Sequence, residues 1–205
     1  MSTAAGPGPN AMDTIDFRPA TAAVAALVRG VRDDQLTGPT PCPAYTVADL
    51  LDHLDGLAQA FTLSARKEPQ PGDGAPDPDG ARLGDGWRDT IPARLEELAA
   101  AWSDPAAYAG STQAGPLEMP ADIAALVALD EVVVHGWDLA RATGQGFAPG
   151  DDAVLACVEF VESFEVPDDV PDDGGLFGPP VPVAPDAPAL DRLAGATGRD
   201  PAWTP

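Results

Sequence analysis

The chain has 205 residues, with 33 acidic side chains against 11 basic ones, and its formal net charge at pH 7 is −22. This charge excludes DNA, RNA and anionic membrane surfaces as expected partners, because each of them requires a basic binding surface. The length suits one domain with a sizeable core, and no apolar run in the sequence is long enough to cross a membrane.

The first part of the chain predicts a leader followed by two helices. Residues 1–12 lack the basic and apolar regions of a secretory signal, so we expect a disordered leader and a cytoplasmic location. Apolar residues at helical spacing predict a first helix over 17–35. A proline-rich stretch ends it, and Thr46 with Asp49 forms a capping-box pattern that opens a second helix, which runs to about Lys67.

The middle of the chain predicts two more helices. An acidic Pro/Gly loop over 68–81 precedes a third helix, which begins at Gly84 or Trp87 and ends near residue 102. Residues 103–119 are predicted to be irregular, with a short hairpin as the alternative. A fourth helix is predicted over 120–143, and because it is apolar nearly all round, we expect it to be packed on several sides.

A fifth helix is predicted from about Pro149 to Phe164, and a Pro/Asp-rich tail follows over 166–205, with one or two helical turns near 187–194. No strong strand signal occurs anywhere. The pattern therefore predicts an all-α fold in which residues 13–165 form a bundle of four main helices with an extra helix. The irregular tail is expected to pack on this bundle.

Both histidines of the chain lie on predicted helices among apolar residues. His53 stands at the edge of the apolar stripe of the second helix. Glu131 and His135 are four residues apart on the fourth helix, so their side chains project from one face. A carboxylate buried there would cost several kcal/mol unless it were paired or bound to a metal.

Two interpretations of these three residues remain open at this point. If the two helices face each other, His53, Glu131 and His135 supply three ligands and leave one position free, as catalytic zinc sites do. Alternatively, Glu131 and His135 form an ion pair within one helix and His53 is an unrelated core histidine. The spacing alone does not decide between them.

Four further residues attract attention. Asp138 follows His135 by one turn and is a candidate to orient a histidine, to act as a fourth ligand or to cap a neighbouring helix. Arg141 either binds a substrate carboxylate or complements the helix C-terminus. Cys42 is expected to be a structural thiol, because no histidine is left to activate it, and Cys157 is expected to be a core residue.

Four sequence segments together resemble a known family. They are LLDHL around His53, the preceding PTPCPAYTV, EVVVHGWDLARATG from Glu131, and the tail from GPPVPV to DRLAGATGRDP. Over residues 21–205 the chain is similar to the mycothiol-dependent maleylpyruvate isomerase N-terminal family of the DinB-like superfamily. The resemblance implies a four-helix bundle with a divalent metal on His53, Glu131 and His135. Zinc is favoured, with nickel or another ion open.

The resemblance also implies a chemistry. The better-studied members use mycothiol as thiol cosubstrate, and coordination by a metal ionises a thiol. The isomerase has a second C-terminal domain that contributes to catalysis, whereas here the Pro/Asp-rich tail follows. A mycothiol S-transferase-like activity, or an unassigned metal-dependent reaction, is therefore favoured over isomerisation of maleylpyruvate. The alternative is a non-catalytic metal-binding or stress-associated interaction protein on the same bundle. The expected partners are a small-molecule thiol and an electrophile, and the protein is expected to be a monomer or homodimer.

Overall fold

The computed structural model describes residues 14–43, 45–70, 77–163 and 177–205. This part of the chain is mostly helical, as expected. Its α-helices are α1 (Arg18–Gly30), α2 (Val47–Arg66), α3 (Trp87–Trp102), α4 (Ala121–Thr143), α5 (Asp151–Glu162) and α6 (Ala189–Ala196). Short 3-10 turns cover Asp33–Gln35, Gly80–Arg82 and Pro105–Tyr108. The expected leader at 1–12 and the expected helix end near Phe164 lie outside the described residues.

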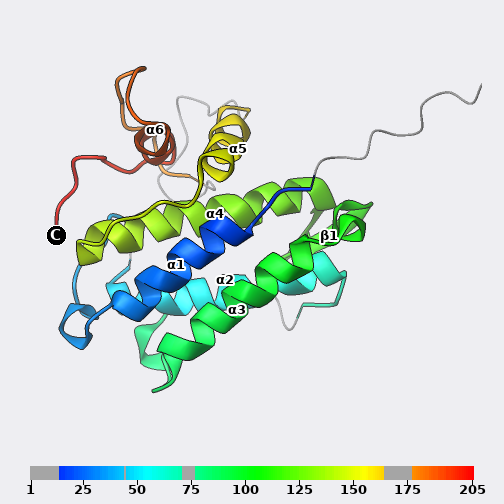
Figure 1. Cartoon of the computed structure of the whole chain (residues 1–205), viewed down its shortest axis with the longest axis horizontal. Coiled ribbons are helices and arrows are strands. Elements are labelled where there is room, and N and C mark those ends of the chain that lie inside the picture. Colours follow the sequence, from blue (N-terminus) through cyan, green and yellow to red (C-terminus); the bar gives the residue numbers. More distant parts are fainter. Residues whose placement is uncertain (1–13, 44, 71–76, 164–176) are drawn as a thin grey trace, which may run out of the picture.

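Helix α4 has neighbours on several sides (Figure 1). Helices α1 and α2 each contact both α3 and α4. Helices α5 and α6 contact each other and lie against α4 on the side away from α1, α2 and α3. Most residues of α4 are therefore buried, which agrees with the apolar character predicted for this helix.

Local chemistry explains the start of α2 and the end of α4. The Thr46 hydroxyl accepts from the Asp49 amide, as the capping box predicts, and α4 stops at Gly144, which has a left-handed φ of 68°. Helix α1 is shorter than predicted. It ends at Gly30, and the next residue is extended. A Cβ at Gly30 would overlap the Gln145 amide, which donates to a carbonyl of the last turn of α1.

The stretch before α4 contains a small antiparallel sheet of β1 (Ser111–Ala114) and β2 (Leu117–Pro120), with Ser111 opposite Pro120. The irregular segment predicted there thus includes the short hairpin. Thr112 donates from its hydroxyl to the Ser64 carbonyl over 2.7 Å, and the Ser64 hydroxyl donates to the backbone of β1. The hairpin is therefore anchored to the end of α2.

One hydrophobic core joins the helices. Trp102 is fully buried, and its ring stacks on that of Phe17 with 5.9 Å between the centroids. Cys157 lies in this core, as predicted, and burial raises the pKa of its thiol. None of the helices in the described residues combines the length and the apolar character needed to span a membrane.

Candidate metal centre

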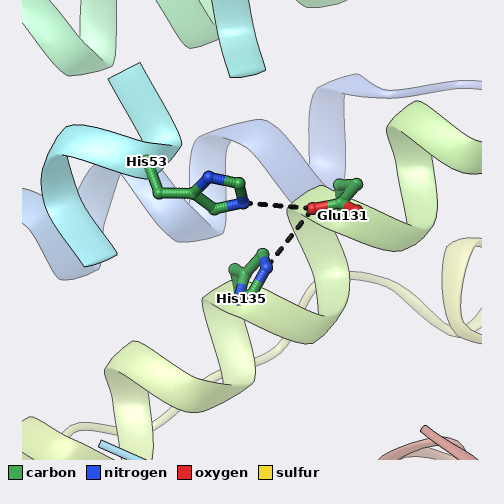
Figure 2. A group of neighbouring side chains, drawn as sticks. All are labelled: His53, Glu131 and His135. Atoms are coloured by element: carbon green, nitrogen blue, oxygen red, sulfur yellow. Dashed lines mark hydrogen bonds and ion pairs between the residues drawn. The ribbon is translucent and has the colours of Figure 1, made fainter. Parts of the chain in front are cut away.

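His53, Glu131 and His135 meet between α2 and α4 (Figure 2). The Oε2 atom of Glu131 lies 3.3 Å from Nε2 of His53 and 3.3 Å from Nε2 of His135. One ligand atom from each residue lies within 4.8 Å of the other two. Both imidazole rings therefore point toward the same carboxylate oxygen.

The packing of α4 explains how these side chains come to face each other. Helix periodicity puts Glu131 and His135 on one face, and α2 packs along that side with His53 opposite. Gly136 follows His135, and a Cβ at this position would come within 2.5 Å of the Phe147 ring and 2.7 Å of Val24. The glycine thus allows α1 to approach α4 closely while His135 faces α2.

Burial and charge act against each other at this site. Side-chain exposure is 25% for His53, 24% for Glu131 and 9% for His135. Burial would raise the pKa of Glu131, but interactions with His135 and His53 outweigh it and hold this pKa well below its usual range. Burial would lower the pKa of His135, but contacts with Asp138 and Glu131 outweigh it and raise the pKa to about 9. Without a metal, Glu131 is therefore anionic and His135 cationic at neutral pH.

The donor set can be compared with what a divalent metal requires. Four ligand atoms at about 2.0–2.2 Å from a tetrahedral zinc ion lie roughly 3.3–3.6 Å from one another. The two separations of 3.3 Å around Glu131 match that spacing. Two imidazole nitrogens and a carboxylate oxygen suit zinc and related divalent ions. The residues present therefore fit such an ion, and His53 is part of the group rather than an unrelated core histidine.

Asp138 lies behind His135 and is fully buried. Its Oδ2 atom is 2.9 Å from Nδ1 of His135, on the side of the ring away from Glu131. Arg199 donates to both oxygens of the same carboxylate, over 3.1 Å and 3.3 Å. Of the three roles considered for Asp138, this placement fits the orientation of a histidine.

The structure places Arg141 and Cys42 outside the three-residue group. The Arg141 guanidinium donates to the Pro201 carbonyl and lies 5.4 Å from the centroid of the Trp137 ring. Arg141 therefore contacts the C-terminal segment. Cys42 is half-buried in the loop before α2, where its carbonyl accepts from the Tyr45 amide over 3.0 Å.

A cavity of about 580 Å³ borders on His53 and Glu131 and lies between α2, the hairpin and α4. Two ion pairs line one part of it: Arg82 with Asp52 at 2.6 Å, and Arg94 with Asp55. Apolar side chains line another part, namely Leu57, Ala60, Phe61, Leu117, Met119 and Val127. The candidate metal centre therefore opens onto a space with both apolar and charged walls.

Sequence reasoning missed two residues near the site. The Tyr45 ring lies 5.5 Å from that of His53 and 6.3 Å from that of His135, measured between centroids. Its position directly before the ligand-bearing helix was the available signal. Arg199 reaches Asp138 from the far end of the chain, and no spacing or periodicity in the sequence connects the two.

Comparison with known proteins gives a family match. Residues 17–140 match the family model described as the mycothiol maleylpyruvate isomerase N-terminal domain. Two proteins of Mycobacterium tuberculosis strains, the uncharacterized proteins MT0763 and Rv0738, are each 30% identical to this chain over 188 residues. Each match covers 86% of this chain and 92% of the relative. No solved structure matches the chain significantly.

Proposed function

The chain belongs to the mycothiol maleylpyruvate isomerase N-terminal domain family, and from this premise we propose that it is a metal- and thiol-dependent enzyme. His53, Glu131 and His135 would hold a divalent ion, with zinc favoured. The proposal includes a DinB-like four-helix bundle made of α1 to α4. The observation that carries it is the convergence of the three ligand atoms within 4.8 Å beside the cavity.

The thiol is the first substrate in this proposal. A divalent metal, when bound, favours the ionised form of a coordinated thiol at neutral pH. Three protein ligands leave a coordination position free, which suits a site that binds a small molecule. The family description points to mycothiol as this thiol. His53 and Glu131 border the cavity, so the body of the thiol would extend into it.

The second substrate is an electrophile held by the apolar wall. Phe61 from α2, Val127 from α4 and Met119 from β2 line the same space. The thiolate would attack an electrophilic carbon there. In a substitution the displaced electron pair would depart with the leaving group, and in an addition it would move onto the carbonyl conjugated with the double bond. If the new carbon–sulfur bond is retained, the reaction is a transfer. If this bond breaks after rotation about the former double bond, the reaction is an isomerisation. We favour the transferase.

The experiment measures consumption of mycothiol by chlorodinitrobenzene, with isomerisation of maleylpyruvate as a parallel assay. Activity should depend on zinc, disappear with a chelator and return when zinc is added. Glu131→Ala should abolish it, whereas Cys42→Ser should leave it nearly unchanged. Full activity after exhaustive metal removal, or its loss in Cys42→Ser with the metal still bound, would contradict the proposal. Bound zinc without thiol consumption would favour the non-catalytic alternative.

A further inference from the structure

Arg199 lies in the segment after α6, and its buried guanidinium contacts Asp138 of α4. Its side chain is 11% exposed, and its Nη2 and Nε atoms donate to the two oxygens of Asp138 over 3.1 Å and 3.3 Å. Its Nη1 atom donates to the Thr197 carbonyl, and its backbone amide donates to the Ala194 carbonyl over 2.8 Å. The end of α6 therefore fixes the guanidinium before it meets Asp138.

The contact continues through Asp138 to the candidate metal centre. Oδ2 of Asp138 accepts from both Arg199 and Nδ1 of His135. Because Nδ1 is engaged by this carboxylate, Nε2 of His135 is the nitrogen that faces Glu131. Histidines that bind metals commonly donate their other ring N–H to a carboxylate in this way, which fixes the orientation of the ring.

Asp138 needs a cationic partner at this position. The carboxylate has no solvent exposure, and a buried charge without a partner is strongly destabilising. His135 meets one of its oxygens, whereas Arg199 meets both. A planar guanidinium is suited to this two-point contact, which fixes both the position and the plane of the carboxylate.

We propose that Arg199 is a positioning residue of the metal centre, acting through Asp138 on the ring of His135. The inference rests on the proposed metal site. It makes the segment after α6 a part of that site, although none of its residues is among the three ligands. Arg141 holds the same segment through the Pro201 carbonyl.

The chain offers a matched control on the same segment. Arg192 on α6 pairs with Glu162 of α5 at 3.8 Å, and its side chain is 34% exposed. Replacing this arginine removes the same charge from the segment without touching Asp138. A comparison of Arg199→Met with Arg192→Met therefore separates the contact with Asp138 from a general effect of charge.

The experiment measures the zinc affinity of the full chain by competition with a chromophoric chelator. Arg199→Met should weaken zinc binding about 10–100-fold, which is typical when a residue that holds a metal ligand in place is replaced. Arg192→Met should leave the zinc affinity within about twofold of the wild type. Arg199→Lys should recover part of the loss, because an ammonium makes one of the two contacts. In an Asp138→Asn background, Arg199→Met should have little further effect. Unchanged affinity in Arg199→Met, equal loss in Arg192→Met, or fully additive losses would overturn the inference.

A second readout does not need the metal. In metal-free wild-type protein at pH 6, the Nδ1 proton of His135 should give a slowly exchanging downfield NMR resonance, because it is buried against Asp138. Arg199→Met should broaden or lose this resonance, and Arg192→Met should keep it. If the wild-type protein binds no zinc, the proposed function fails, while this resonance still decides whether Arg199 positions Asp138. If Arg199→Met does not fold, Arg199→Lys and Asp138→Asn carry the same comparison.

Discussion

The rings of His53 and His135 meet edge to face, with 4.7 Å between their centroids and 85° between their planes. They come from α2 and α4, and Glu131 lies at 3.3 Å from a nitrogen of each. The two imidazoles and the carboxylate are therefore close enough to share one divalent cation in the proposed site.

Loss of any one ligand should weaken metal binding sharply. For His53→Ala, Glu131→Ala and His135→Ala we expect a larger loss than the roughly 10–100-fold typical of residues behind a ligand. Helical circular dichroism should persist, because the core around Trp102 does not include the site. Glu97→Ala, on the exposed side of α3, is the control and should retain full affinity. A ligand variant that unfolds outright would instead mark the metal as structural.

The stability of the metal-free protein should have a distinctive pH dependence. The pKa of His135 is raised to about 9, so its stabilisation is complete below the unfolded value of about 6.5 and is lost as pH rises toward 9. The pKa of Glu131 is lowered, so its stabilisation is present above its unfolded value of about 4.3 and is lost as pH falls. These two groups therefore favour the highest melting temperature between roughly pH 5 and 6.5. Burial raises the pKa of Asp130 to about 7, so this carboxyl lowers the stability further as pH rises toward 7.

Added zinc should reverse the alkaline part of this profile. Metal binding requires a neutral His135, so the gain in melting temperature on adding zinc should grow from pH 5 to 8. His135→Gln is the control, since it removes the titrating group and should abolish the alkaline decline of the metal-free protein. An equal decline in wild-type protein and His135→Gln would refute the assignment to His135.

The cavity predicts a change in substrate binding that leaves the metal in place. Val127 lies one turn before Glu131 on α4 and lines the cavity. Val127→Phe should raise the KM for an apolar electrophile about tenfold or more, because hydrophobic pockets discriminate by 1–3 kcal/mol per methylene. Zinc affinity should remain that of the wild type. Leu155→Phe, at an exposed position of α5, should change neither quantity. Unchanged KM in Val127→Phe would place the electrophile elsewhere.

Two glycines on helices should respond in opposite ways to alanine. Gly136→Ala forces a Cβ against Phe147 and Val24, so we expect a loss of about 1–3 kcal/mol in the free energy of unfolding. Gly56→Ala on α2 meets no atom within 4 Å and should stabilise the helix by about 0.5–1 kcal/mol. Denaturant unfolding measures both. A neutral Gly136→Ala would show that α1 has room to move away from α4.

Local sequence chemistry sufficed for the start of α2 and the end of α4. The Thr46 cap and the glycine at 144 act within a few residues, so their effect can be predicted from the sequence. At the end of α1, Gly30 is close to Gln145, which lies far away in the sequence, and no local pattern predicts this contact. The hairpin was only suggested, since four-residue strands carry too little periodicity to define a register.

The contacts of the site also fall into those that local sequence predicts and those that it does not. Helix periodicity alone places Glu131 and His135 together. The approach of His53 depends on which helices are neighbours, and this came from the resemblance rather than from periodicity. The contact of Arg199 with Asp138 and the cavity behind the hairpin depend on how distant segments pack. No sequence pattern within a single element encodes these features.

The contact between Arg199 and Asp138 has a consequence for biosynthesis. At roughly 5–20 residues per second, the ribosome needs about 3–13 seconds to proceed from His135 to Arg199. The nascent chain therefore presents both histidines and Glu131 before the arginine that holds Asp138 has been made. A metal ion that binds during translation would find the ring of His135 not yet held by Asp138 and Arg199. The full metal affinity would be reached only when the segment after α6 packs on α4.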